Sequence, residues 1–415
     1  MANVLVLSLV FPPDNVSTAH IMGNLASDLK RAGHNVSVIT TTPHYNLDAD
    51  AERRQPLRRT MFPLFRRSEF DGVPVLHVVM PRKEKSILRR LTSWSAFHVL
   101  STIAAIMIRP RPDVIICPSP PLTIGVSAWL IALIRRARFV YNVQEIYPDI
   151  AISLGALRSK TLIAMARLLE QFVYRRSAAV TVIAPRMKQR LLERGVPQSK
   201  LLVIPNFVDT SDLEPLSKDN EFSREHGLVD KFVVNYSGNI GPAQGLETLV
   251  RAAELLRDDD RVHFVITGDG TLFEAMRNQI RDLNLTNVTI LGYQPFARMS
   301  AIYASADVCI VPQAAATGSD AVPSKVYRIM ACARAVLAVT EPGSDLASLV
   351  DVAQCGVSAR PDAAEELAKL LASAASDRER WMAMGQRGFE YVRASYTREI
   401  ITAQYERVVQ RLARP

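Results

Sequence analysis

Cysteine and glycine are both scarce in this sequence, with 4 and 18 copies among 415 residues. The four cysteines lie far apart in apolar runs and form neither a CxxC pair nor the spacing of a metal site. This pattern excludes a disulfide framework and favours buried thiols in a reducing compartment. The low glycine content and an apolar content of 48% are typical of a globular chain. A chain of this length exceeds one ordinary hydrophobic core, so two domains of roughly 200 residues are expected.

Signals for export and for membrane insertion are also missing. The first residues, MANVLVLSLVFPP, carry no basic leader and no small-residue cleavage site, so we expect them to form a first strand. Residues 114–134 are uncharged over the length of a membrane span, but Pro118, Pro120 and Pro121 interrupt them near their start. We expect a buried strand at 114–117, a turn, and a buried helix at 122–134.

Charge is unevenly divided between the two halves of the chain. Residues 1–205 contain 28 Lys and Arg against 13 Asp and Glu, whereas residues 206–415 contain 22 against 28. The basic half is expected to meet an anionic partner, either a membrane surface or a phosphorylated substrate. Nucleic acid is a poorer candidate, because no nucleic-acid-binding motif is present.

Short apolar runs alternate with amphipathic runs along the whole chain. Twelve runs are expected to be strands: 4–9, 35–40, 73–79, 114–117, 139–143, 179–183, 201–205, 232–236, 262–267, 288–291, 308–311 and 335–339. Regular alternation of strand and helix predicts an α/β fold with a parallel, doubly wound sheet in each half.

The polar segment 206–231 is the expected domain boundary, because it carries Pro215 and has no strong period. We therefore predict an N-terminal domain at 1–205, a C-terminal domain at 206–397, and a last helix at 398–415 that joins the first domain. Two similar domains of this kind predict a cleft between them, with ligands at the carboxyl ends of the strands.

The most informative motif is SGNIGPAQGLET at residues 237–248, between an apolar run and an amphipathic run. A glycine-bearing turn from strand to helix lets the backbone approach a phosphate and directs free helix N–H groups at it. A second strand-to-helix junction follows later, with VPSKVYRIMACARAV at residues 322–336. Together the two junctions predict a site for a diphosphate-bearing ligand in the C-terminal half.

Further phrases occur in a characteristic order: FPPDNVSTAH (11–20), RAGHNVSVIT (31–40), SPPL (119–122), EIYPDIAISLGAL (145–157), VIPNFVD (203–209), SGNIGPAQGLETL (237–249), TGDG (267–270), LGY (291–293), ADVCIVP (306–312) and PSKVYRIMA (323–331). In order and spacing they resemble the family 4 glycosyltransferases of GT-B fold. In particular they are similar to the bacterial branch that builds O-antigen, capsule and colanic acid repeat units. The resemblance covers nearly the whole chain.

The resemblance implies two Rossmann-like domains and a retaining transfer of a sugar from a UDP-sugar or GDP-sugar to an acceptor hydroxyl. The C-terminal domain would hold the nucleotide and the N-terminal domain the acceptor. No metal or other cofactor is expected, because helix N-termini and basic side chains neutralise the diphosphate in such enzymes.

On the donor side, the resemblance assigns nucleotide-sugar binding to one set of residues: Ser17, Gly238, Asn239, Gly241, Gln244, Gly268, Asp320, Ser324, Lys325 and Arg328. Asn239 and Gln244 are neutral where many relatives carry a basic pair. Lys325 is expected to compensate as a point charge at the start of a helix that Ser324 caps. Asp320 keeps a carboxylate for the ribose or the donor sugar. Arg328 reverses a charge that is usually negative, and an exposed helix charge is the alternative for it.

On the acceptor side, Val16-Ser17 stands where the family has a Gly pair, which makes close backbone approach to a diphosphate harder. Gln144-Glu145 replaces a His-Asp pair. Glu145 is expected to orient or deprotonate the acceptor hydroxyl, with Gln144 and His20 as further catalytic candidates. The alternatives are that Glu145 caps the following turn, that His20 is an ordinary residue of the first helix, and that the departing phosphate takes the proton.

Two basic and aromatic segments, 53–70 and 82–108, predict binding to an anionic membrane surface. That fits a polyprenyl-diphosphate-linked acceptor and a peripheral enzyme on the cytoplasmic face of the inner membrane. A disordered basic loop and a core helix are the alternative for these segments. Two other functions stay open: a catalytically decayed sugar-nucleotide-binding scaffold, and a soluble enzyme of the same fold such as a nucleotide-sugar epimerase.

Overall fold

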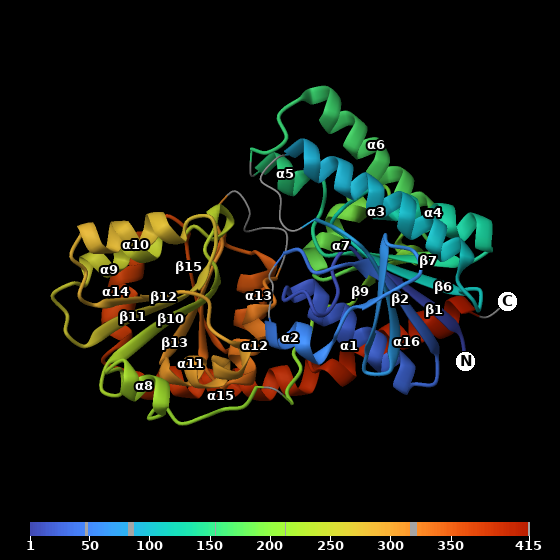
Figure 1. Ribbon diagram of the computed structural model, residues 1–415. Helices are drawn as coiled ribbons and strands as arrows, with labels where there is room; N and C mark the ends of the chain where they lie inside the picture. Colours follow the sequence, from blue (N-terminus) through green and yellow to red (C-terminus); the bar gives the residue numbers. More distant parts are fainter. Residues whose placement is uncertain (46–48, 82–86, 154, 212, 316–321, 414–415) are drawn as a thin grey trace. The chain divides into compact units, whose positions relative to one another are not determined.

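The computed structural model describes residues 1–45, 49–81, 87–153, 155–211, 213–315 and 322–413 (Figure 1). The chain divides into two compact units. The first comprises Met1–Ile152, Leu157–Asn206 and Glu399–Pro415, and the second comprises Ser153–Ala156 and Phe207–Arg398. The last helix of the chain therefore belongs to the first unit.

A nine-stranded sheet, in the order β3-β4-β5-β2-β1-β6-β7-β8-β9, forms the centre of the first unit. From β5 to β9 in this order all neighbours are parallel. Every residue of β6 and β8 is buried, as parallel strands covered on both faces require. The strands are β1 (Asn3–Leu7), β2 (Asn35–Thr41), β3 (Arg58–Arg59), β4 (Phe65–Phe70), β5 (Val73–Val78), β6 (Val114–Pro118), β7 (Arg138–Val143), β8 (Ala179–Val182) and β9 (Leu201–Val203).

Helices cover both faces of this sheet (Figure 1). On one face, the ring of Tyr141 in β7 lies 5.9 Å from that of Tyr174 in α6. On the other face, Asn142 donates a 2.9 Å hydrogen bond to the hydroxyl of Tyr405 in α16. The helices of the first unit are α1 (Ser17–Arg31), α2 (Ala49–Arg54), α3 (Ile87–Met107), α4 (Ile124–Arg135), α5 (Asp149–Ser153), α6 (Lys160–Arg176), α7 (Pro185–Glu193) and α16 (Arg398–Ala413).

Residues 53–70 are more regular than the sequence suggested. They contain the end of α2 and an antiparallel pair, β3 and β4, that extends the sheet beyond β5. Every residue of β4 is half-buried or exposed, so the strand has no apolar period that sequence reasoning could detect. Within 82–108, residues 82–86 lie outside the described part of the chain. The ring of Phe97, within this segment, is fully buried and is not part of the unit's surface.

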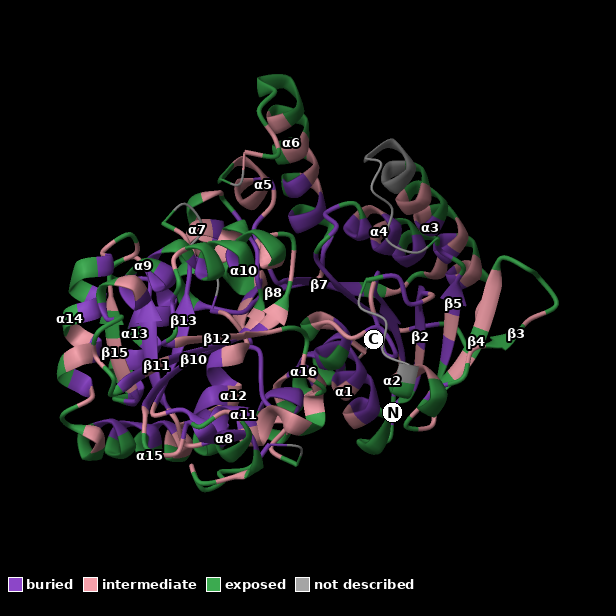
Figure 2. Cartoon of the chain, turned by 60° about the vertical axis from the view of Figure 1, so that its left-hand side comes forward, coloured by how far each residue is buried: buried purple, intermediate pink, exposed green. Residues whose placement is uncertain are grey.

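The second unit has a six-stranded sheet, in the order β12-β11-β10-β13-β14-β15, with all pairs parallel. The strands are β10 (Phe232–Asn239), β11 (Val262–Asp269), β12 (Val288–Leu291), β13 (Val308–Pro312), β14 (Ala335–Val339) and β15 (Gly356–Ala359). β13 and β14 are buried throughout and β10 and β11 over most of their length, whereas every residue of the edge strands β12 and β15 is half-buried or exposed (Figure 2). The helices are α8 (Glu221–Glu225), α9 (Glu247–Leu255), α10 (Phe273–Asp282), α11 (Met299–Ser305), α12 (Lys325–Ala331), α13 (Asp345–Ala353), α14 (Ala364–Ala374) and α15 (Arg378–Ser395).

The uncharged stretch 114–134 forms β6, a turn and most of α4, as predicted. The expectation that the helix is buried is wrong for its outer face, where Leu130, Leu133 and Ile134 are exposed. Among the helices that the structure describes, none is both long enough and apolar enough to cross a bilayer.

Candidate functional site

Two glycines shape the end of β10 in the second unit. Gly238 and Gly268 lie opposite each other in the β10–β11 pair, with φ angles of 152° and 148°. A Cβ on Gly268 would overlap the carbonyl oxygen of Gly238, so this glycine is needed for close packing of the two strands. A Cβ on Gly238 would lie 2.5 Å from Nζ of Lys325. Gly238 therefore leaves the space that the lysine side chain occupies.

Lys325 is the first residue of α12, and its ammonium packs on an aromatic ring. Nζ lies 4.0 Å from the ring centroid of Tyr236, whose hydroxyl donates to the carbonyl of Asn239. Burial, and after it the nearby charge of Arg328, lowers the pKa of Lys325 to about 7. The fold thus holds a cation where its charged form is disfavoured.

Arg328 lies one turn further along α12, with its guanidinium carbon 5.4 Å from the ring centroid of Phe296. In the described part of the chain, neither Arg328 nor Lys325 has a carboxylate within ion-pair distance. Two adjacent cations with aromatic partners form a site that favours an anion. Arg328 is half-buried, which departs from the alternative of an exposed helix charge.

Other residues expected on the donor side have different surroundings. The Asn239 side-chain amide donates a 3.1 Å hydrogen bond to the side-chain oxygen of Gln244, so these two side chains are hydrogen-bonded to each other. Gly241 is buried in the same loop. Ser324 holds the N-cap position of α12, but its side chain makes no capping hydrogen bond, so the predicted cap is wrong. Asp320 lies outside the described residues.

In the first unit, the side chain of Gln144 is buried and hydrogen-bonded. It is 7% exposed, and its amide donates to Asn142 at 2.7 Å while its amide oxygen accepts from Asn206 at 2.9 Å. Its backbone N–H donates to the hydroxyl of Ser119. The side chain is fully engaged inside the unit, which argues against its expected place in the catalytic machinery.

Glu145 follows directly and has the opposite character. Its side chain is half-buried, and burial raises the pKa of its carboxyl group above the ordinary value. Within the described residues the carboxyl group accepts no hydrogen bond, so the alternative of a turn cap finds no support there. A carboxyl group with a raised pKa at the carboxyl end of a parallel strand is suited to accept a proton.

The remaining candidates of the first unit lie around the start of α1. Ser17 is exposed in the first turn, and the exposed His20 ring shares a 2.7 Å hydrogen bond with Asn15. Asp14 is buried and accepts backbone N–H groups of His44 and Tyr45. Sequence reasoning missed His44, although it stands in the loop after a predicted strand.

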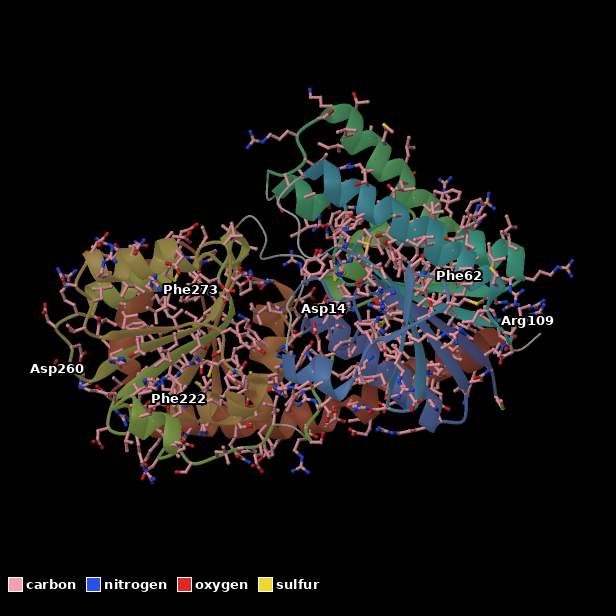
Figure 3. All side chains as sticks on the ribbon, viewed as in Figure 1. Asp14, Phe62, Arg109, Phe222, Asp260 and Phe273 are labelled. Carbon is pink, nitrogen blue, oxygen red and sulfur yellow. The ribbon has the colours of Figure 1, made fainter. Side chains whose placement is uncertain are left out.

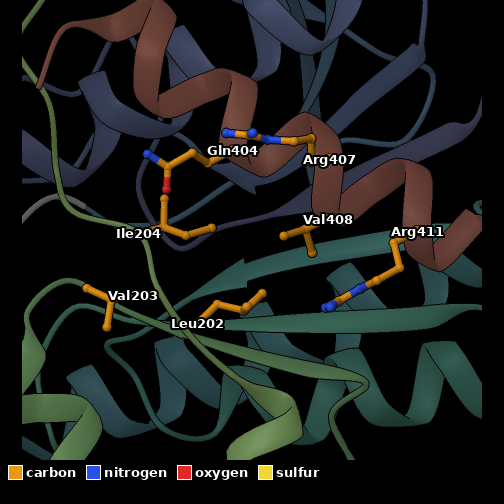
Figure 4. Close-up of a pocket in the computed structure, with 7 residues that line it drawn as sticks. All are labelled: Leu202, Val203, Ile204, Gln404, Arg407, Val408 and Arg411. Carbon is orange, nitrogen blue, oxygen red and sulfur yellow. The ribbon is translucent and has the colours of Figure 1, made fainter. Parts of the chain in front are cut away.

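A groove of about 280 Å³ lies elsewhere in the first unit, between β9 and α16 (Figure 4). Its lining includes Ile204, Arg407 and Arg411, and none of the predicted site residues reaches it. The candidate residues of each unit therefore lie away from this groove.

Comparison with known proteins identifies the class. Residues 18–206 match the Glycosyl transferase 4-like domain, and residues 218–391 match Glycosyl transferases group 1. The two matches follow one another over most of the chain. The chain therefore belongs to the family 4 glycosyltransferases, and its fold is GT-B.

Individual relatives agree with this class. The chain is 25% identical over 356 residues to the putative colanic acid biosynthesis glycosyl transferase WcaI of Escherichia coli, covering 84% of this chain and 86% of the relative. It is 24% identical to the probable glycosyltransferase WbjE of Pseudomonas aeruginosa, over 63% of this chain and 66% of the relative. The structure of Anabaena HepE with UDP-glucose superposes with a TM-score of 0.73 at 16% identity, covering 99% of this chain and 100% of the other.

Lys325 makes folding stability depend on pH. The pKa of Lys325 is lower in the folded state than in the unfolded state. Burying the charged lysine therefore lowers the free energy of unfolding by its full amount below pH 7, and this loss of stability disappears above about pH 10.5, where the lysine is neutral in both states. We expect Lys325→Met to be more stable than the wild type at pH 6 by roughly 1–3 kcal/mol, allowing for partial exposure. Urea unfolding at several pH values should show this advantage closing as the pH rises to 10. The exposed Lys369→Met is the control, and an advantage independent of pH would contradict the assignment.

Proposed function

We propose that this glycosyltransferase transfers a sugar, with retention of anomeric configuration, from a UDP-sugar or GDP-sugar to a polyprenyl-diphosphate-linked saccharide in bacterial surface polysaccharide assembly. The observation that carries the proposal is the pair of cations Lys325 and Arg328 beside Gly238, at the carboxyl end of β10. A nucleotide diphosphate supplies the anion that this pair lacks within the described chain.

Several relatives support the choice of substrates. HepE has been solved with UDP and with UDP-glucose, and a relative in Mycobacterium tuberculosis is a GDP-mannose-dependent mannosyltransferase acting on a phosphatidylinositol monomannoside. WcaI carries the name of colanic acid biosynthesis. We infer that the donor diphosphate is bound by Lys325, Arg328 and the N–H groups of the Gly238 loop, with no metal required.

The chemistry breaks the bond between the anomeric carbon and the diphosphate oxygen and forms a bond from that carbon to the acceptor oxygen. The acceptor hydroxyl loses one proton. Glu145 is our candidate for orienting this hydroxyl, and its raised pKa suits it to take the proton. The departing phosphate on the same face of the sugar is the other acceptor for it.

Membrane association is supported by exposed apolar side chains on three helices of the first unit, α3, α4 and α6. Figure 1 shows where these helices lie. Nine large apolar side chains are exposed on them: Val99, Ile103, Met107, Leu130, Leu133, Ile134, Leu162, Met165 and Leu168. α3 and α4 end close together, because Arg135 donates to the carbonyl of Ile108 and Arg111 to that of Arg136. Arginines at the edge of an exposed apolar surface fit an anionic bilayer.

The turn between β3 and β4 has the same character. Met61, Phe62 and Leu64 are exposed there, next to arginines of both strands (Figure 3). Of the predicted segment 53–70, this turn is the part whose side chains suit the headgroup layer.

A nucleotide titration tests the donor site. We expect one of UDP, GDP, dTDP or CMP to stabilise the purified protein saturably, and Lys325→Ala to weaken its binding at least about tenfold, which is about 1.4 kcal/mol. Lys369→Ala, an exposed lysine on α14, should bind as the wild type does. A wild type that responds to no nucleotide would refute the donor assignment and favour the scaffold alternative.

Turnover tests the role of Glu145. Glu145→Gln should lower kcat by about 10²–10⁴-fold, the usual contribution of a general base, while the nucleotide Kd stays unchanged. In the wild type, kcat should fall as the pH is lowered through the raised pKa of Glu145, because protonation removes the base. The assay follows radiolabelled sugar from the responding nucleotide class into membrane lipid extract. Full activity of Glu145→Gln would contradict a role of Glu145 as the base and would favour the departing phosphate as the proton acceptor.

Vesicle sedimentation tests the apolar surface. Replacing Ile103, Leu133 and Leu168 together by Ser should reduce binding to phosphatidylglycerol-containing vesicles at least about tenfold. The matched control replaces Leu255, Val352 and Met382, which are exposed in the second unit, by Ser. Equal loss in both triple variants would contradict a specific membrane surface.

A further inference from the structure

A buried acid–imidazole pair, Asp14 and His44, lies beyond the carboxyl ends of two parallel strands of the first unit. β1 and β2 are parallel neighbours, and Asp14 and His44 stand in the loops that leave their carboxyl ends. One carboxylate oxygen of Asp14 accepts the backbone N–H groups of His44 and Tyr45, each at 3.0 Å. Asp14 is labelled in Figure 3. These bonds attach the loop after β2 to the loop after β1 and fix the backbone that carries the imidazole.

The surroundings of Nδ1 of His44 decide which ring nitrogen carries the proton. Nδ1 lies 3.1 Å from the carbonyl oxygen of Thr42, 3.0 Å from the hydroxyl of Thr41 and 3.6 Å from the carboxylate of Asp14. The Thr41 hydroxyl donates its own proton to the carbonyl of Leu9 at 2.7 Å, so it can only accept from the ring. All three groups around Nδ1 are acceptors, and the proton therefore resides on Nδ1.

The other nitrogen, Nε2, then presents a lone pair. Burial lowers the pKa of His44, although the neighbouring Asp14 opposes this shift. The ring is therefore neutral at pH 7. His44 is 8% exposed, and within the described chain Nε2 has no hydrogen-bond partner. Buried acceptors without a donor are uncommon in folded proteins, and a ligand is one of the things that satisfies them.

We propose that Nε2 of His44 accepts a hydrogen bond from a hydroxyl group of the sugar substrate, with Asp14 and Thr41 as the residues that position the imidazole. The inference rests on the proposed function, because it requires a sugar at this edge of the sheet. A neutral lone pair selects a hydroxyl and disfavours a phosphate oxygen. The ring of Tyr45, which is 37% exposed, is centred 4.6 Å from the imidazole and lies beside the proposed contact.

Nuclear magnetic resonance tests the tautomer without any substrate. In the full chain labelled with ¹⁵N-histidine, long-range proton–nitrogen spectra at pH 7.5 should show His44 neutral and protonated on Nδ1. The His44→Gln variant assigns the signal by its loss. A proton on Nε2, or a charged ring, would overturn the proposal whatever the enzyme does.

Kinetics test the contact itself. His44→Phe should lower kcat/KM at least about tenfold, the equivalent of one hydrogen bond, without changing the nucleotide Kd. His44→Gln, whose amide oxygen reaches the position of Nε2, should keep more of the activity. His98→Gln is the control, because both nitrogens of that half-buried ring are already bonded, to Ser127 and Thr123.

Two assays separate the source of the hydroxyl. Transfer to membrane lipid extract and hydrolysis of the nucleotide sugar by water both fall in His44→Phe if the hydroxyl belongs to the donor sugar, and only transfer falls if it belongs to the acceptor. An active wild type with an equally active His44→Phe would overturn the inference alone. A wild type that turns over no nucleotide sugar would refute the proposed function first.

Discussion

Parallel strand pairing is the constraint on which both units depend. It requires a crossover after each strand, and the crossover helices cover both faces of the sheet. Polar groups can then leave the core only at the strand ends. In the first unit the carboxyl ends of β1, β2 and β7 are followed by Asp14, His44 and Glu145. In the second unit β10 and its neighbour β13 lead to Gly238 and to α12. Within each unit, residues distant in sequence therefore gather at one edge of that unit's own sheet.

The cations Lys325 and Arg328 of the second unit have aromatic rings as partners, which leaves their charges available to bind an anionic ligand. A carboxylate beside Lys325 or Arg328 would neutralise the charge before a ligand arrived. The rings of Tyr236 and Phe296 support the charges through their π faces and leave the N–H groups without an anion in the described chain. The conformational freedom of Gly238 makes this possible, because its missing side chain leaves room for the ammonium.

The repeated fold could be predicted because continuous apolar runs such as Ala335–Val339 identify buried parallel strands. The glycine-bearing loop after β10 could also be predicted, because its glycines stand next to an apolar run in the local sequence. The hairpin of β3 and β4 could not, since its half-exposed residues have no apolar period. Gln144 and Glu145 are adjacent in sequence, and only the structure shows that their surroundings differ. Gln144 accepts a hydrogen bond from Asn206, and a contact between residues so far apart in the sequence could not be predicted. The tautomer of His44 could not be predicted from the sequence either, because it depends on contacts with Leu9, Asp14 and Thr41 together.

The position of α16 has a consequence for synthesis. Asn142 of β7 donates to the hydroxyl of Tyr405, and the segment Glu399–Pro415 belongs to the first unit although it follows the second unit in the sequence. While the ribosome translates the second unit, the nine strands of the first are complete but one of their faces lacks this helix. A nascent chain can finish the second sheet before the first is fully covered. The first unit can therefore complete its packing only after the second unit has been translated.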